Sequence, residues 1–343
     1  MIKLLVPTRN RPSSVNALLG YLETFYPNTQ LIIADGSDEL RKEEVEKVCG
    51  NYSENLSVEF KSYPSDLPYF ERILDVLLSC DDEFIAMGAD DDYPIMEVLD
   101  KAKETLINNA QYKSIVPADV VLTLREDGQL TSRLSHSRNV LHKNPINRVK
   151  DYSYWHFATS YGVTQKALLL ERYRMMSEYN CASFIDFQIG IEDTMHGEIK
   201  AVPEIGCIRT QTFEHEYFRA TDTMVFLRKS EKILAYRDYL TSKLGKLEEN
   251  AETDSRKLAD LLISRRIADL TGGGAPGKSN FRDSKQFKDP TLQQQYKNFY
   301  ELFEDGTEIR QNYIAKLRYA RDVLLSNVAK SESTGLVKNY ENI

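Results

Sequence analysis

Short apolar segments alternate with amphipathic ones over the first ninety residues or so, and this alternation constrains the fold more than any other feature. Each apolar segment is too short for a helix and is followed by polar residues, as expected of a buried strand. Strands are expected at residues 2–6, 31–34, 58–60 and 83–87, with helices near 14–26, 39–50 and 69–79. This alternation predicts an α/β fold, a mostly parallel sheet flanked by helices on both faces.

Polar residues follow three of these predicted strands. Thr8-Arg9-Asn10-Arg11 follows the first, Asp35-Gly36-Ser37-Asp38 the second, and Gly88-Ala89-Asp90-Asp91-Asp92 the fourth. Sheets of this kind bind ligands at the carboxyl ends of their strands. We therefore expect the three polar segments to meet at one functional site.

The three consecutive aspartates at 90–92 require a physical explanation, because neighbouring carboxylates repel one another. A divalent cation removes the repulsion, and Mg²⁺ or Mn²⁺ binds one or two carboxylates together with a substrate diphosphate. The triplet alone leaves open a solvated acidic turn, or the cap of a helix that begins near Ile95.

Together and in this order, the three motifs resemble family 2 of the GT-A glycosyltransferases. The resemblance is strongest over about the first 100 residues and weaker over the following 120. It implies a GT-A fold and an inverting, metal-dependent glycosyl transfer. The donor would be a nucleoside-diphosphate sugar, with a UDP-sugar favoured, the acceptor a glycan or a lipid-linked molecule, and the cofactor Mn²⁺ or Mg²⁺.

The resemblance also assigns residues to the nucleotide and the metal. Asp35 matches the residue that binds the base, and the remaining nucleotide-side positions are Pro7, Thr8, Arg9, Arg11, Arg72 and Asp90. The triplet matches the DXD motif in one of two registers. In the first, Ala89 replaces the first aspartate and Asp91 binds the metal; in the second, Asp90 and Asp92 form the pair. Asp91 is favoured, with Asp92 as a second metal ligand. Apart from the resemblance, His156, His196 and His215 could each supply a ligand to the metal or diphosphate, and His215 is preferred by its position.

Inverting transfer also needs a carboxylate base to deprotonate the acceptor hydroxyl. Glu192-Asp193 resembles the family's Glu-Asp motif, in which Asp193 is the base. A helix N-terminus, where the dipole favours acidic residues, is the alternative, and Asp186 is the second candidate base. Trp155 and His156 lie in an aromatic-rich segment that is interpreted as an acceptor platform or as a buried cluster.

The resemblance implies a GT-A domain at residues 1–221, divided near residue 100 into nucleotide and acceptor halves. The charged, amphipathic pattern that follows predicts a helical region at residues 222–343. Helices are expected near 222–247, 251–270, 291–303 and 307–330, and they leave open a homo-oligomer. Residues 272–279 satisfy the P-loop pattern, but a helical segment rather than a strand precedes them, so a flexible loop is expected.

Composition excludes several classes of protein. The net charge of -8 argues against a nucleic-acid partner, and four dispersed cysteines predict neither a zinc site nor a disulfide framework. The absence of a signal peptide or spanning segment predicts a cytoplasmic location, with peripheral membrane association left open.

Two further functions remain as alternatives: a non-catalytic nucleotide-sugar or glycan-binding member of a synthesis complex, and a sugar-phosphate nucleotidyltransferase. The second is disfavoured because residues 7–14 contain no glycine.

Overall fold

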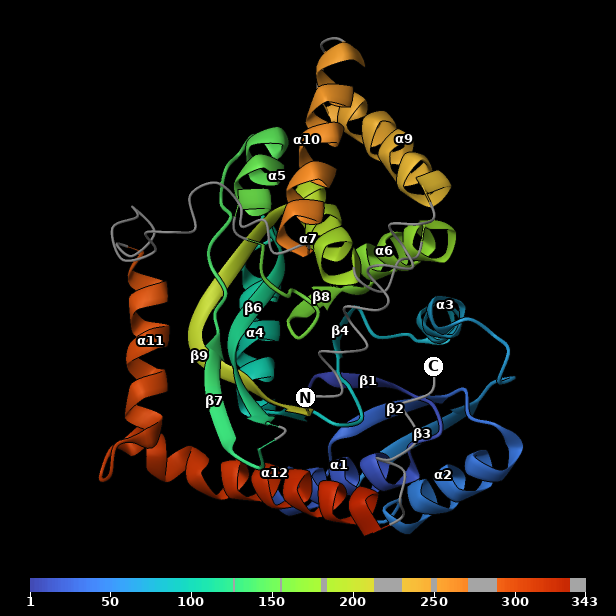
Figure 1. Cartoon of the computed structure of the whole chain (residues 1–343), viewed down its shortest axis with the longest axis vertical. Coiled ribbons are helices and arrows are strands. Elements are labelled where there is room, and N and C mark those ends of the chain that lie inside the picture. The colour runs from blue at the N-terminus through green and yellow to red at the C-terminus, as the bar shows by residue number, and fades with distance from the viewer. Residues whose placement is uncertain are drawn as a thin grey trace.

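The computed structural model describes residues 1–125, 127–154, 156–179, 184–212, 230–247, 252–270 and 289–333. Within these ranges the chain forms one nine-stranded sheet, in which the order is β3-β2-β1-β4-β8-β6-β9-β5 and β7 pairs with β6 (Figure 1). The strands are β1 (Lys3–Thr8), β2 (Gln30–Asp35), β3 (Ser57–Ser62), β4 (Phe84–Met87), β5 (Tyr93–Pro94), β6 (Tyr112–Leu124), β7 (Leu130–Ser135), β8 (Val163–Gln165) and β9 (Glu198–Thr212).

The amino-terminal half is the parallel sheet that the sequence predicts. β1 pairs in parallel with β2 on one side and β4 on the other, and β3 continues the sheet beyond β2. Thr8 is in register with Asp35, so the two strands end at the same level. The connecting helices are α1 (Pro12–Phe25), α2 (Glu39–Asn51) and α3 (Tyr69–Ser79). The predicted α/β fold with a mostly parallel, helix-flanked sheet is confirmed, and it has a GT-A-like form.

The other half of the sheet contains two long strands that the sequence did not predict, β6 of 13 residues and β9 of 15 residues. They run parallel to each other, and β8 joins them to β4 through antiparallel pairing. The two-residue strand β5 pairs with β9 at Tyr93 and Ile208. This pairing brings β9 beside the aspartate triplet, which directly precedes β5 in the chain.

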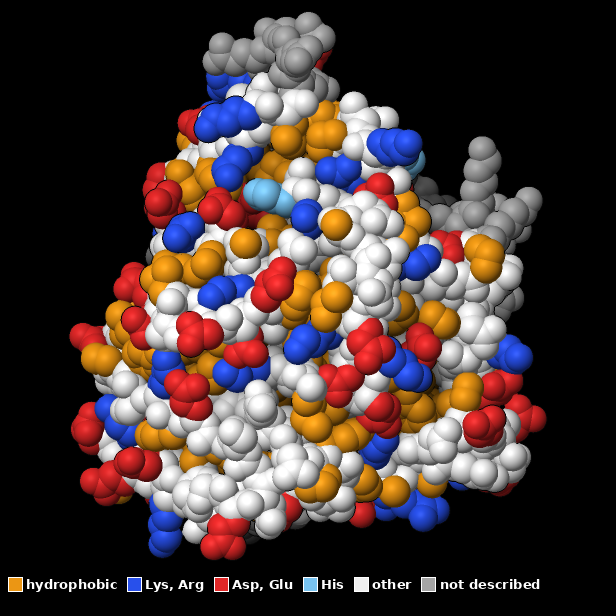
Figure 2. Space-filling view, turned by 180° about the vertical axis from the view of Figure 1, so that it is seen from behind, with side chains coloured by type: hydrophobic (Ala, Val, Ile, Leu, Met, Phe, Trp, Pro, Cys, Tyr) orange, Lys and Arg blue, Asp and Glu red, His pale blue; other side chains and the backbone are white. Residues whose placement is uncertain are grey.

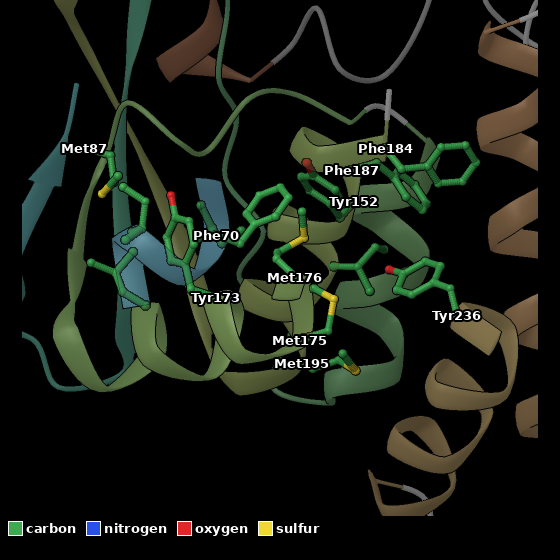
Figure 3. Close-up of a cluster of buried hydrophobic side chains, with 14 of the residues drawn as sticks. Phe70, Met87, Tyr152, Tyr173, Met175, Met176, Phe184, Phe187, Met195 and Tyr236 are labelled. Carbon is green, nitrogen blue, oxygen red and sulfur yellow. The ribbon is translucent and has the colours of Figure 1, made fainter. Parts of the chain in front are cut away.

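Each face of the sheet is covered by its own hydrophobic core. On β1, Leu5 belongs to one core while Leu4 and Val6 belong to the other, as the two-residue period of a strand requires. The first core includes residues of α3 and of the helices α5 (Pro145–Tyr154), α6 (Lys166–Tyr179) and α7 (Ile185–His196). Figure 3 shows this core, with Phe70, Met87 and Tyr173 at one end and Phe184 and Tyr236 at the other. The second core lies beneath α1, α2 and α4 (Met96–Asn108).

The carboxyl-terminal helices complete both cores. They are α9 (Ser230–Leu247), α10 (Glu252–Leu270), α11 (Pro290–Phe303) and α12 (Glu308–Ser333), close to the predicted helices. Leu258 and Leu262 of α10 belong to the first core, and Leu317 and Leu324 of α12 belong to the second. In Figure 1, α9 and α10 form a hairpin beside α5, and α12 runs along the opposite end of the molecule next to α1.

The surface in Figure 2 carries acidic and basic side chains interspersed over the whole visible face. Among the described residues, none of the helices combines the length and the apolar character needed to cross a bilayer.

Candidate active site

A pocket of about 410 Å³ opens where β1 and β4 end, between the amino-terminal turn of α7 and the end of β9. Eight of the residues predicted to bind the nucleotide or the metal line it: Pro7, Thr8, Arg9, Arg11, Arg72, Asp90, Asp91 and Asp92. The expected meeting of the first and third polar segments is therefore what the structure shows. The rest of the wall consists of Tyr69, Met87, Gly88, Ala89, Ser160, Tyr161, Tyr173, Ile185, Asp186, Ile189, Arg209, Thr210 and Gln211.

Asp90 and Asp91 accept hydrogen bonds from the end of β1 and from the loop that follows it. The Thr8 hydroxyl donates to Asp90 Oδ2 over 2.6 Å. The Arg11 guanidinium bridges the two carboxylates, with Nη1 2.6 Å from Asp90 Oδ1 and Nη2 2.7 Å from Asp91 Oδ2. Burial raises the pKa of Asp90 to about 7, despite the opposing attraction of Arg11. Asp91 is the most open of the three carboxylates, with 20% of its side chain exposed.

Asp92 is held from the opposite side of the pocket. Its Oδ2 accepts a hydrogen bond from the Tyr161 hydroxyl, and its Oδ1 accepts one from the Thr210 backbone N–H over 2.9 Å. The Arg209 guanidinium lies over the Tyr161 ring, 4.5 Å from the ring centre, with Nε 3.8 Å from Asp92 Oδ2. Burial raises the pKa of Asp92 to about 6. Asp92 thus has donors on both oxygens, which leaves Asp91 as the carboxylate best able to accept a new ligand.

The charges on the pocket wall fit a divalent cation that arrives with a diphosphate. The lining residues include four aspartates (Asp90, Asp91, Asp92 and Asp186) and four arginines (Arg9, Arg11, Arg72 and Arg209). A nucleoside diphosphate would add negative charge to this balanced set, and a divalent cation would offset it. Within the described ranges, His, Cys, Asp and Glu side chains form no cluster of three that could hold a metal.

Arg72 and Asp35, two residues predicted to bind the nucleotide, are both buried. Arg72 is buried, and its Nη1 donates to the carbonyl oxygens of Thr8 and Ala34 over 2.9 and 3.2 Å. A Cβ on Gly36 would lie 2.3 Å from this nitrogen, so the glycine makes room for the arginine. Asp35 is fully buried, accepts hydrogen bonds from Ser37, and does not belong to the pocket wall. Burial lowers the pKa of Arg72 and raises that of Asp35.

Asp193 and Glu192, predicted as catalytic, lie in the core and not on the pocket wall. Asp193 is fully buried and forms an ion pair with Arg172 of α6, with Oδ1 2.5 Å from Nη2. Glu192 accepts a hydrogen bond from the Tyr239 hydroxyl of α9, and burial raises its pKa. Glu192 and Asp193 lie away from the pocket because α7 already begins at Ile185. Asp193 follows Asp186 by two helical turns, which places it roughly 10 Å further along the helix axis.

Asp186 is the carboxylate that α7 presents to the pocket. It lies in the first turn of the helix, and its Oδ1 accepts a hydrogen bond from the Ser160 hydroxyl over 3.1 Å. The Tyr152 hydroxyl lies 2.7 Å from the carbonyl oxygen of Phe157 and 3.2 Å from that of Asp186. The residue predicted as the second candidate base therefore faces the acidic triplet's pocket.

The remaining predicted residues lie elsewhere. His156 lies 2.7 Å from Arg266 Nη1 of α10, measured from its Nε2, and it does not line the pocket. Trp155, His215 and the P-loop-like segment 272–279 fall outside the described residues. Residues on the pocket wall that the sequence did not predict include Tyr69, Ser160, Tyr161, Tyr173, Arg209 and Thr210. The signal for Arg209 and Thr210 is the pairing of β5 with β9, which no local pattern reveals.

Comparison with known proteins gives distant structural similarities. No protein-family model and no curated protein matches the chain. A crystal structure of S. aureus TarS 1–349 shares 14% identity, with 97% of this chain and 91% of that chain covered and a TM-score of 0.48. The same fragment in complex with UDP-GlcNAc gives 14% identity, coverage of 97% and 92%, and a TM-score of 0.46. Mannosyltransferase PcManGT from Pyrobaculum calidifontis, in complex with GDP-Man and Mn²⁺, shares 12% identity. The match covers 95% of this chain and 86% of that chain, with a TM-score of 0.44.

Proposed function

We propose that the chain is an inverting glycosyltransferase that transfers a sugar from a nucleoside-diphosphate sugar to an acceptor hydroxyl. One observation carries the proposal. A single pocket at the carboxyl ends of β1 and β4 combines four arginines and an acidic triplet with Asp186, a carboxylate from a distant element. This arrangement separates the groups suited to a leaving diphosphate from a group suited to proton transfer.

The donor would occupy the side of the pocket formed by β1, α3 and the triplet. Arg9 and Arg72 lie there with Pro7 and Thr8, and their positive charge favours phosphate oxygens. Asp91, the most open carboxylate of the triplet, would hold a Mn²⁺ or Mg²⁺ ion that arrives with the diphosphate. The chemistry that such an ion supplies is neutralisation of the charge on the leaving diphosphate.

The transfer itself would use Asp186 as the base. The acceptor oxygen forms a bond to the anomeric carbon of the sugar while its proton passes to the Asp186 carboxylate. The bond between the anomeric carbon and the β-phosphate oxygen breaks, and its electron pair leaves with the nucleoside diphosphate. Asp186 is favoured over Asp193 because only Asp186 lines the pocket.

The acceptor would bind on the less charged side of the pocket. Tyr173, Ile185 and Ile189 line that side, and aromatic and apolar surfaces suit the carbon-bound faces of a sugar ring. This supports a glycan or a lipid-linked sugar as the acceptor class.

A thermal-unfolding panel with UDP, GDP, CDP, CMP and ATP, each with and without Mn²⁺, tests the proposal. We expect one nucleoside diphosphate to raise the unfolding temperature, and to raise it further with Mn²⁺. A ligand present at about 100 times its dissociation constant stabilises the folded chain by about 2.7 kcal/mol. Asp91→Asn should remove the gain from Mn²⁺, whereas Asp81→Asn, at an exposed acid outside the pocket, should keep it. Stabilisation by ATP alone, or by none of the five, would contradict the proposal.

A further inference from the structure

Two consecutive residues contact two different carboxylates of the pocket. The Ser160 hydroxyl donates to Asp186 Oδ1 over 3.1 Å, and the Tyr161 hydroxyl donates to Asp92. Asp92 follows β4, whereas Asp186 begins α7, nearly a hundred residues later. A single short segment therefore links the proposed donor side of the pocket to the proposed base.

The sheet and the neighbouring helices fix the position of this segment. The Gly162 N–H donates to the Thr159 carbonyl over 3.2 Å, which closes a turn around Ser160 and Tyr161. A Cβ on Gly162 would lie 2.5 Å from the carbonyl oxygen of Ile115, so only glycine allows the turn to press against β6. Directly after the turn, Val163 pairs with Ala86 of β4 and with Ile115 of β6.

The other end of the segment is fixed through Tyr152. This side chain is fully buried, and its hydroxyl donates to the Phe157 carbonyl over 2.7 Å. A Cβ on Gly190 would lie 2.0 Å from the same hydroxyl oxygen, so α7 passes directly against the tyrosine. The turn and the first part of α7 are thus held at a fixed separation by packing.

We propose that Ser160 is a positioning residue that orients the Asp186 carboxylate for proton transfer. This inference rests on the proposed function. The hydroxyl holds Oδ1, so that Oδ2 is left to accept the proton of the acceptor. Displacement of a reacting group by about 1 Å can cost on the order of a hundredfold in rate, so a fixed orientation has a measurable effect. Tyr161, its neighbour, acts on Asp92 and therefore on the donor side.

The test measures release of nucleoside diphosphate from UDP-GlcNAc, UDP-glucose and GDP-mannose with Mn²⁺, where water serves as the acceptor. Ser160→Ala should lower kcat by about ten-fold to a hundred-fold and leave the donor KM unchanged. Ser160→Thr keeps the hydroxyl and should restore most of the rate. Tyr161→Phe, the adjacent matched variant, should instead raise the donor KM.

A double-mutant cycle separates positioning from a general structural effect. In an Asp186→Asn background, Ser160→Ala should cause no further loss of kcat. An equal loss in both backgrounds, or an unchanged kcat in Ser160→Ala alone, would overturn the role of Ser160 while leaving the proposed function standing. Absence of turnover by the unaltered chain, together with no stabilisation by any nucleoside diphosphate, would overturn the proposed function, and this inference with it.

Discussion

One buried carboxylate near the pocket, that of Asp119, lacks a full set of hydrogen-bond donors among the described residues. Asp119 of β6 lies behind the pocket wall, is 4% exposed, and has one carboxylate oxygen without a hydrogen-bond partner in the described chain. Its nearest cation is Arg209, whose Nη1 is 4.0 Å from Oδ2. Burial raises the pKa of Asp119 to about 7, and the attraction of Arg209 only partly opposes this. A carboxylate in this setting costs stability once it is ionised.

The pH dependence of stability should therefore change in Asp119→Asn. The folded-state pKa of about 7 lies above the usual value of 3.8, so the folded chain binds the proton more tightly than the unfolded chain. The stabilisation from that proton is complete below pH 4 and is lost as the pH rises through 7. Asparagine resembles the protonated acid, so the variant should exceed the natural chain in stability by a smaller margin at pH 5 than at pH 8.

Urea unfolding at both pH values measures the effect. Each unit of pKa shift corresponds to about 1.4 kcal/mol, so the gain at pH 8 is at most about 4 kcal/mol. Asp127→Asn, at an exposed acid in a turn, is the matched control and should behave alike at both pH values. If the difference in stability between Asp119→Asn and the natural chain is the same at pH 8 as at pH 5, Asp119 is ionised at low cost in the folded chain.

The residues of the site differ in how well the sequence predicts them. Thr8, Arg11 and Asp90 follow apolar strands, and parallel strands bring their carboxyl ends together, so their convergence could be predicted. The choice between Asp186 and Asp193 depends on where α7 begins. Phe184, the residue before the helix, makes no side-chain cap hydrogen bond, so the sequence carries no capping signal there.

Among the elements, the long strands β6 and β9 were not predicted because each contains residues that usually interrupt strands. Pro117 lies within β6, and Pro203 and Gly206 lie within β9. The pairing shifts register on both sides of Ala118, which absorbs the irregularity. A Cβ on Gly206 would lie 2.1 Å from the Pro117 ring, so the glycine of one strand accommodates the proline of the other. Such compensation exists only between paired strands and cannot be recognised in either alone.

Helix α11 is attached to this irregular part of the sheet by a buried polar contact. Gln295 is fully buried, its Oε1 accepts from the Ser137 backbone N–H, and its Nε2 donates to Ser137 Oγ and to the Val202 carbonyl. Asp289 caps the start of the helix by accepting from the Thr291 N–H. The amide satisfies groups on β9 and on the segment that follows β7 at once.

Gln295→Ala should destabilise the chain by about 2–4 kcal/mol, because it leaves buried polar groups without partners. Gln294→Ala removes an exposed side chain whose hydrogen bond goes to Asn298 on the same helix, and it should change stability by less than about 0.5 kcal/mol. Urea unfolding of the two variants compares them directly. Equal effects would show that the Gln295 contacts do not hold α11 to the sheet.

Over the whole molecule, the chain closes its two cores with helices from its carboxyl-terminal part. Leu258 and Leu262 of α10 complete one core, and Leu317 and Leu324 of α12 complete the other. Lys316 also forms an ion pair with Glu97 of α4, 2.7 Å apart. The amphipathic pattern predicts these helices but does not indicate which face of the sheet each covers.

A chain that ends at residue 221 should therefore fail to fold cooperatively. Burial of each lost leucine contributes about 1.5–3 kcal/mol, so the four together approach the whole stability of about 5–15 kcal/mol that is usual for a protein. Near-ultraviolet circular dichroism and urea unfolding measure the outcome. A chain that ends at residue 333 keeps all the described helices and is the control. A sharp unfolding transition in the shorter chain would contradict the shared cores.

The proposed role of Asp186 as the base is tested most directly by comparing Asp186→Asn with Asp193→Asn in the transfer of sugar from a nucleotide donor. The measurement is the rate of nucleoside diphosphate release, for variants shown by circular dichroism to be folded. Asp186→Asn should lower kcat by on the order of a hundredfold or more. Asp193→Asn keeps an oxygen for Arg172 and should retain most of the rate. Near-normal turnover in Asp186→Asn, with loss in a folded Asp193→Asn, would show that Asp186 is not the base.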